Sequence, residues 1–255
     1  MILDHQRVAA KIVTEVLLEL KTFTKPDVSL DMLDNLAERL ILERGGTPYN
    51  KGYEPTWSEV PYPNTICCSV NHEIAHAPPR GRSLKTGDIV TYDIGVRYKT
   101  GCGDAALTVA VGKIDNRKTR LMRYALQTLY EGIKVVKAGA PLSLIGDTMD
   151  RFASLRGYTI IKEFGSHHIG KEMHEEPFLS NFYNKDDENK FLEEGKIICL
   201  EPILTPGNGM MAMNAEDKWT AFTTDYQPCA MFEAMMIIGK DKAEILTGHL
   251  SENMI

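Results

Sequence analysis

Residues 162–177 of this 255-residue chain read Lys-Glu-Phe-Gly-Ser-His-His-Ile-Gly-Lys-Glu-Met-His-Glu-Glu-Pro. This stretch holds three of the seven histidines and two glycines, and its apolar residues follow no regular period. A neutral imidazole is the commonest side-chain metal ligand near neutral pH. The stretch is therefore typical of a binding site, although a solvated polar loop can have the same composition.

Composition and charge narrow the class of protein. The net charge is −6 and the chain has no basic run, so nucleic-acid binding has no electrostatic support. Five cysteines without paired C-x-x-C spacing favour reduced thiols over disulfides or a zinc knuckle. No apolar run reaches the roughly 18 residues of a membrane span. We therefore expect a cytoplasmic protein, a single domain over residues 1–255, that binds neither nucleic acid nor membrane.

Hydrophobic periodicity predicts an α+β fold in which helices pack on the outer face of a curved antiparallel sheet. A long ordered loop is expected at 47–64, and the histidine-rich stretch is also interpreted as a loop. The expected helices span 3–21, 29–45, 117–137 and 143–156, with Ser29 as the N-cap of the second. The expected strands span 65–70, 89–96, 105–111, 158–163, 196–204, 229–239 and 243–247.

Two aspartates lie on the arms of a predicted hairpin that turns at 99–101. A pairing sum near 197 would place Asp93 opposite Asp104, with both side chains on one face of the sheet. Like charges that face each other destabilise a hairpin, and an unpaired carboxylate in an apolar strand costs several kcal/mol. A bound cation resolves both problems. For Asp104 alone, a turn cap or a lysine partner is a reasonable alternative.

Two glutamates repeat this pattern in later apolar strands. Glu201 follows Ile-Ile-Cys-Leu, and Glu233 lies within Cys-Ala-Met-Phe-Glu-Ala-Met-Met. One buried acid is often half of an ion pair, but these strands hold no matching lysine or arginine near the acids. Four such acids and a histidine-rich stretch are better explained by two shared divalent cations. Carboxylates that bridge two metals about 3.5–4 Å apart form a recurring hydrolytic site.

These residues together resemble the pita-bread metallopeptidases, and within them the type I methionine aminopeptidases. The resemblance rests on Asp93 and Asp104 eleven positions apart, His167 in Gly-x-His-x-Ile-Gly, His174-Glu-Glu-Pro and the two glutamates. It covers residues 3–248. His76 in Ser-Val-Asn-x-x-x-x-His, and the 32 positions from Glu201 to Glu233, favour this branch over prolidases and type II enzymes.

The resemblance implies a metal site and the role of each ligand. Asp93 would chelate one ion, Asp104 and Glu233 would bridge two ions, and His167 and Glu201 would complete the other shell. The two divalent ions would be Mn, Fe, Co or Zn, since an oxygen and nitrogen shell accommodates all four.

The resemblance also implies catalytic and substrate-binding residues. Glu201 would assist proton transfer, His174 would hydrogen-bond the scissile carbonyl oxygen, and His76 would contact the scissile peptide nitrogen. The expected methionine pocket consists of Tyr62, Cys67, Met173 and Trp219. An aromatic and sulfur-rich pocket suits a flexible, polarisable thioether.

The implied function is removal of the initiator methionine from nascent proteins and peptides, by a monomer that acts close to the ribosome. Two alternatives remain open. One is an aminopeptidase of the same fold with another N-terminal or Xaa-Pro specificity. The other is a non-catalytic binding protein that retains the fold.

Several positions depart from the usual family pattern. His168 stands for a glycine, Met173 for a phenylalanine, and Gly95 for a common threonine. Ala234 and Met235 stand where a polar pair usually follows the bridging glutamate. We expect these changes to remove hydrogen bonds around the ligands, which typically tunes metal affinity by about 10–100-fold. For His168 we favour an exposed residue without a role over a partner of a ligand.

Overall fold

The computed structural model describes residues 1–248, so residues 249–255 of the expected domain lie outside the described part. Within that part, no helix is both long and apolar enough to cross a membrane. The α-helices are α1 (Ile2–Phe23), α2 (Leu30–Glu43), α3 (Asn116–Val135) and α4 (Leu142–Ser154). They begin and end within three residues of the predicted bounds. Ser29 does occupy the N-cap of α2, but its side chain makes no capping hydrogen bond.

The strands of residues 1–248 form four antiparallel sheets. One joins β1 (Thr47–Pro48), β4 (Ile89–Tyr98), β2 (Cys67–Val70) and β5 (Gly101–Ala110). A second joins β13 (Ala230–Met231), β10 (Ile203–Thr205) and β6 (Thr159–Ile160). A third joins β11 (Met211–Met213), β12 (Ala221–Thr223) and β3 (Glu73–Ala75). The fourth joins β15 (Ala243–Ile245), β14 (Ala234–Ile238), β9 (Ile197–Leu200), β7 (Gly165–His168) and β8 (Glu175–Ser180).

The β4–β5 hairpin separates the helices from the candidate site. A Cβ added to Gly101 would lie 2.7 Å from the backbone nitrogen of Gln6, and one added to Gly103 would lie 2.6 Å from that of Ala10. These two glycines therefore let α1 pack directly against β5. Because side chains alternate along a strand, Asp104 points to the opposite face, away from α1.

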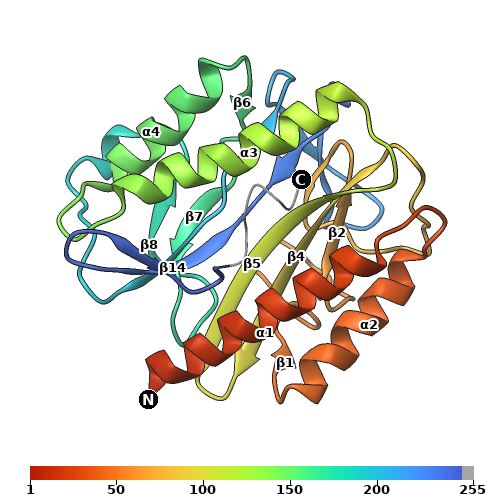
Figure 1. Ribbon diagram of the computed structural model, residues 1–255, viewed down its shortest axis with the longest axis horizontal. Helices are drawn as coiled ribbons and strands as arrows, with labels where there is room; N and C mark the ends of the chain where they lie inside the picture. The colour runs from red at the N-terminus through yellow and green to blue at the C-terminus, as the bar shows by residue number, and fades with distance from the viewer. Residues whose placement is uncertain (249–255) are drawn as a thin grey trace.

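The helices cover one side of the sheets, as Figure 1 shows: α1 crosses β4 and β5, α2 lies beside α1, and α3 and α4 lie over the other half. The largest apolar cluster fills the space beneath them, with fully buried residues such as Tyr92, Leu126 and Phe232. A helix-covered outer face and a free inner face agree with the predicted α+β architecture.

The predicted strands lie where strands are found, but two of them are each divided into two shorter strands. Residues 196–204 form two strands interrupted at Glu201, and residues 229–239 form two strands interrupted at Glu233. The histidine-rich stretch expected as a loop instead contributes β7 and the start of β8. Four strands of two or three residues, β1, β3, β11 and β12, were not predicted, because so few residues carry no readable alternation.

Candidate metal centre

A cavity of about 470 Å³ opens on the inner face of the sheets. All eleven residues singled out from the sequence lie on its wall: Asp93, Asp104, His167, Glu201, Glu233, His76, His174, Tyr62, Cys67, Met173 and Trp219. These residues are separated by up to 171 positions in the chain, from Tyr62 to Glu233. Their convergence follows from how the four sheets pack together.

The two aspartates share a sheet face but are not opposite each other. Asp93 pairs with Ala106 and Asp104 pairs with Gly95, so the pairing sum is 199 and not 197. The turn has two residues, Lys99 and Thr100, which shifts the register by two. A shift of two preserves the face, so both carboxylates still reach the cavity as diagonal neighbours.

The two glutamates reach the cavity from the breaks between strands. The backbone nitrogen of Glu201 donates to Ser166 Oγ at 3.1 Å, and Asn181 Nδ2 donates to the Glu201 carbonyl at 3.3 Å. Ser166 and Asn181 are themselves hydrogen-bonded and fully buried. Glu233 is held by its backbone nitrogen, which donates to the Ala106 carbonyl at 3.0 Å. The backbone at both breaks is thus held by hydrogen bonds.

His167 lies at the centre of the acidic cluster. Its Nε2 is 3.8 Å from Asp104 Oδ2, 3.5 Å from Glu201 Oε1 and 4.0 Å from Glu233 Oε1. Its Nδ1 lies 3.0 Å from the His168 carbonyl, which can only accept, so Nδ1 carries the proton. Burial lowers the pKa of His167 to about 3, so the ring is neutral. The Nε2 lone pair therefore faces the carboxylates, as a metal ligand requires.

The carboxylates are poorly stabilised by protein groups. Burial raises the pKa of Asp93 to about 7, and burial together with neighbouring acids raises those of Asp104, Glu201 and Glu233 well above their usual range. Within residues 1–248, Asp104 Oδ1 and Glu233 Oε1 are buried without a hydrogen-bond partner. Possible ligand atoms of Asp93, Asp104 and Glu233 lie within 4.8 Å of one another. This donor set fits divalent cations.

Two further histidines face the same space. The ring of His174 lies 4.7 Å from that of His167, and desolvation lowers the pKa of His174, so it is a neutral hydrogen-bond donor. His76 follows β3 in a left-handed backbone conformation, with φ at 58°. Burial lowers the pKa of His76 to about 4, so this ring is also neutral at pH 7.

One end of the cavity is apolar and aromatic. Tyr62 and Trp219 meet edge to face with ring centroids 4.9 Å apart, and Cys67 packs with them. The Tyr62 hydroxyl donates to the Ile66 carbonyl at 3.1 Å, which fixes that ring. Burial raises the pKa of the Cys67 thiol well above its usual value. Cys67 is therefore an apolar wall residue and not a nucleophile.

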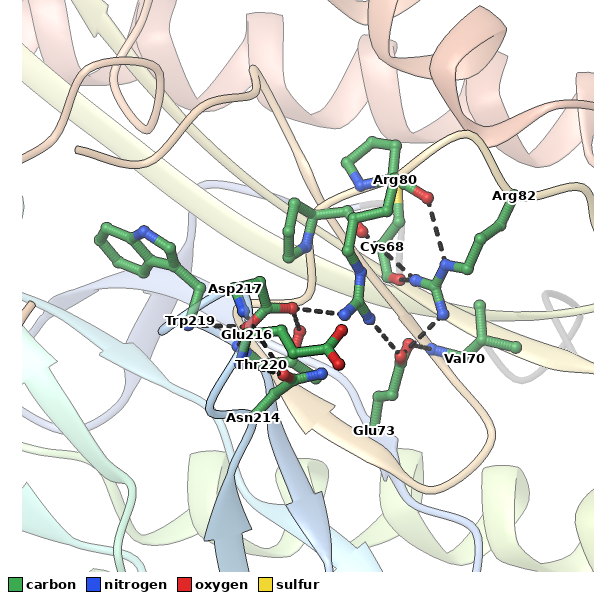
Figure 2. Close-up of polar contacts among 12 residues, drawn as sticks. Cys68, Val70, Glu73, Arg80, Arg82, Asn214, Glu216, Asp217, Trp219 and Thr220 are labelled. Carbon is green, nitrogen blue, oxygen red and sulfur yellow. Dashed lines mark hydrogen bonds and ion pairs between the residues drawn. The ribbon is translucent and has the colours of Figure 1, made fainter. Parts of the chain in front are cut away.

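A network of charges fixes the wall that carries His76 and Trp219. Figure 2 shows the Arg80 guanidinium between the carboxylates of Glu73 and Asp217, with its Nη2 2.9 Å from Glu73 Oε1. Arg82 donates to the same Glu73 oxygen at 2.7 Å. Asp217 in turn accepts from the backbone nitrogen of Trp219 at 2.9 Å. The loop before β12 is thus joined to the β3 segment from which His76 extends.

The departures from the family pattern have different outcomes. His168 is buried, with 7% of its surface exposed, and its Nδ1 donates to the Pro177 carbonyl at 2.8 Å. The expectation of an exposed residue was therefore wrong, because His168 holds β8 beside β7. Ala234 and Met235 are buried and apolar, and Met235 packs with Cys199 behind His167. Because neither side chain can donate a hydrogen bond, they leave Glu233 Oε1 without a partner.

Sequence reasoning missed several residues of the site. Trp57 and Phe164 line the cavity, and the ring of Trp57 stacks on His76 at 5.7 Å. Trp57 belongs to the 47–64 segment, which was expected as a long ordered loop, and Trp57 itself was not assigned to the site. A tryptophan in a polar loop was the available signal. Arg80 and Asp217 could not have been paired from a single sequence.

Comparisons with known proteins agree with this geometry. The model of metallopeptidase family M24 matches residues 4–240. Methionine aminopeptidase 1 of Bacillus subtilis is 33% identical over 245 residues, covering 96% of each chain. The methionine aminopeptidase of Aquifex aeolicus is 33% identical over 247 residues, covering 96% of this chain and 95% of that protein.

Solved structures agree as well. The crystal structure of methionine aminopeptidase from Thermotoga maritima superposes with a TM-score of 0.90 at 30% identity, covering 96% of each chain. Prolidase from Pyrococcus furiosus, at 18% identity and a TM-score of 0.74, shares the fold alone over 98% of this chain and 64% of its own. The pita-bread fold predicted from the sequence is confirmed. From its sequence and its structure alike, this chain belongs to metallopeptidase family M24.

Proposed function

We propose that this protein is a metal-dependent aminopeptidase that removes the N-terminal methionine from peptides and nascent proteins. The observation that carries the proposal is the placement of five ligand-type side chains beside an aromatic and sulfur-lined pocket in one cavity. The relatives named methionine aminopeptidase, at 33% identity over nearly the whole chain, support it.

The metal ligands in this proposal are Asp93, Asp104, His167, Glu201 and Glu233. Two divalent ions, Mn, Fe, Co or Zn, would fit a set of four carboxylates and one neutral imidazole. Such ions, when bound, lower the pKa of coordinated water and neutralise charge that develops on the scissile carbonyl. The unpartnered buried oxygens of Asp104 and Glu233 support cation binding between them.

Three residues have catalytic roles in this proposal. The Glu201 carboxylate takes the proton of the attacking water and passes it to the leaving nitrogen. The neutral ring of His174 donates a hydrogen bond to the carbonyl oxygen as that oxygen becomes negative. His76, which lines the same cavity, would contact the scissile peptide nitrogen and thereby orient the bond.

The first side chain of the substrate would enter the pocket of Tyr62, Cys67, Met173 and Trp219. An unbranched thioether fits such a pocket because sulfur contacts aromatic ring edges favourably, by about 0.3–1.5 kcal/mol. We further infer that the protein acts as a monomer in the cytoplasm, close to the ribosome. All five cysteines are free and buried, which is compatible with a reducing compartment.

A peptide panel tests the function. The purified protein, loaded with Mn(II), Fe(II) or Co(II), is given Met-Ala-Ser, Leu-Ala-Ser and Met-Pro-Ser, and free amino acids are measured. Methionine release from Met-Ala-Ser is expected. Glu201→Gln should lower kcat by about 10²–10⁴-fold and weaken metal binding, because the proton acceptor and a proposed metal ligand are lost together.

The exposed acid Glu193 provides a matched control, and Glu193→Gln should keep full activity. No methionine release with any metal would overturn the proposal. A preference for another first residue, or for the Xaa-Pro bond, would favour a different specificity on the same fold. Saturation with fewer than two metal ions and no hydrolysis would favour a binding protein.

A further inference from the structure

A surface loop overhangs the pocket. Its neck is closed by two backbone hydrogen bonds, from Tyr62 to the Tyr53 carbonyl at 2.9 Å and from Gly52 to the Tyr62 carbonyl at 2.8 Å. Between these points residues 54–61 form a compact turn, which a hydrogen bond from Ser58 Oγ to the Val60 carbonyl at 3.0 Å stabilises. Because both ends of the loop meet at this neck, the tip can shift without disturbing a strand.

Trp57 at the tip of this loop leans over the candidate site. Its ring stacks on His76 with centroids 5.7 Å apart and planes at 19°, and meets Trp219 edge to face at 4.9 Å. The side chain lines the same cavity as the proposed metal ligands. Even so, 53% of its surface remains exposed. About half of the indole therefore remains available to contact a ligand in the cavity, where further burial of its apolar surface would be favourable.

Two other residues of the pocket wall are held in place by hydrogen bonds. Trp219 is fixed through Asp217 and Arg80, as Figure 2 shows, and Tyr62 is fixed by its hydrogen bond to Ile66. Within residues 1–248, the Trp57 side chain makes ring contacts with His76 and Trp219 and no hydrogen bond. It is therefore a wall residue that can adjust to what enters the pocket.

We propose that Trp57 is a specificity-determining residue that closes the pocket over the first side chain of the substrate. The ligand class is an N-terminal residue with a linear apolar side chain, whose far end would contact the surface that the Trp57 and Trp219 rings form together. The inference rests on the proposed function and extends it by one residue. A bulky first side chain such as phenylalanine would displace the indole from His76 and lose this contact.

The consequences differ from those of a catalytic residue. Trp57 contacts the ring of His76, which is proposed to orient the scissile bond, and the ring of Trp219 in the pocket. Its loss should therefore raise KM for methionine peptides by a larger factor than it lowers kcat. The selectivity for methionine over phenylalanine should fall, because the enclosing surface that distinguishes them by size is gone.

The test compares Trp57→Ala with Trp57→Phe and with Val60→Ala, an exposed apolar residue of the same loop that does not line the cavity. Binding of free L-methionine to the Mn(II)-loaded protein is measured by calorimetry. The ratio of kcat/KM for Met-Ala-Ser to that for Phe-Ala-Ser is measured in parallel. Thermal melting of each variant verifies that it is folded.

Trp57→Ala is expected to weaken methionine binding about tenfold, equivalent to about 1.4 kcal/mol, and to lower the selectivity ratio by a similar factor. Trp57→Phe should retain most of the methionine affinity and of the selectivity ratio. Val60→Ala should match the unsubstituted protein in both measurements. Equal results for Trp57→Ala and Val60→Ala would overturn the inference. If the unsubstituted protein binds methionine without hydrolysing peptides, and Trp57→Ala weakens that binding, the inference holds and the proposed reaction fails.

Discussion

At the scale of single residues, Gly95 lies directly behind Met173, which lines the cavity. A Cβ on Gly95 would lie 2.5 Å from Met173 Cε and 2.8 Å from Asn50 Oδ1. Both residues depart from the pattern of the family that the chain resembles. The Met173 methyl group fills the space left by the missing side chain at 95, so the two departures compensate each other.

This compensation predicts non-additive effects on stability. Gly95→Ala alone should lower the free energy of unfolding by about 1–3 kcal/mol, because the new methyl group overpacks the space beside Met173. Met173→Ala alone should cost about 2–5 kcal/mol through the cavity it leaves. The double variant should cost less than the sum, since the alanine methyl enters the vacated space. Urea denaturation of the metal-free protein measures all three.

A second pair of substitutions distinguishes compensation between Gly95 and Met173 from a general loss of packing. Met235 is a buried methionine of the same apolar cluster and is not among the nearest contacts of Gly95. Gly95→Ala combined with Met235→Ala should therefore be additive within about 0.5 kcal/mol. Additivity in the Met173 pair as well would refute the proposed compensation.

At the scale of elements, the Arg80 network couples β3 to β12 and thereby sets the distance between His76 and Trp219. Glu73 is almost fully buried, with 7% of its side chain exposed, and Asp217 has 12% exposed. The Arg80 guanidinium contacts Glu73 through Nη2 and Asp217 through Nη1. A lysine offers a single point charge and cannot span both positions.

Arg80→Lys should therefore behave almost like Arg80→Gln. Both are expected to raise KM for Met-Ala-Ser about threefold to tenfold with kcat within about twofold, because Trp219 moves while the metal ligands stay in place. In a Trp57→Phe background, Trp219 is the sole tryptophan, and its fluorescence should shift to longer wavelength. Arg44→Gln, which breaks the more exposed ion pair with Glu15, is the control and should change neither. Full activity of Arg80→Lys would argue against the two-acid geometry.

At the scale of the whole molecule, the acidic cavity makes stability depend on pH and metal together. Burial raises the pKa of Asp93 from 3.8 to about 7 and raises the pKa values of the neighbouring acids. The folded state then binds more protons than the unfolded state between these values. Without metal, this contribution to stability is therefore present below pH 4 and is lost as the pH rises toward 7.

Bound metal ions should restore the stability that is lost when these carboxyl groups release their protons. The rise in Tm caused by Mn(II) is expected to be larger at pH 7.5 than at pH 5.5, because ions replace protons on these ligands. Differential scanning calorimetry with Mn(II) and with a chelator measures it at each pH. Asp93→Asn should reduce the difference between the Mn(II)-induced rises in Tm at the two pH values, whereas Asp4→Asn, at the exposed N-terminus, should not. An equal metal-induced rise at both pH values would contradict the proton–metal exchange.

Much of the architecture could be predicted because it is local. Apolar residues at helical spacing placed four helices, and alternation placed Asp93 and Asp104 on one face of a hairpin. The register error of two arose because the choice between turn lengths depends on the geometry at Lys99, whose φ is 52°. The short strands beside Glu201 and Glu233 were merged, since each break is imposed by a neighbouring sheet.

The chain alone specified which chemical groups are present, in which order, and in which local conformation: four acids in apolar strands, a histidine-rich stretch, and apolar pocket residues. The folded molecule alone specified which groups meet. His168 is buried beside Pro177, Trp57 lies on His76, and Arg80 joins Glu73 to Asp217. The reason is physical, because periodicity arises from bonds between near neighbours, whereas contacts between distant residues depend on how separate sheets pack and on the charges that this packing buries.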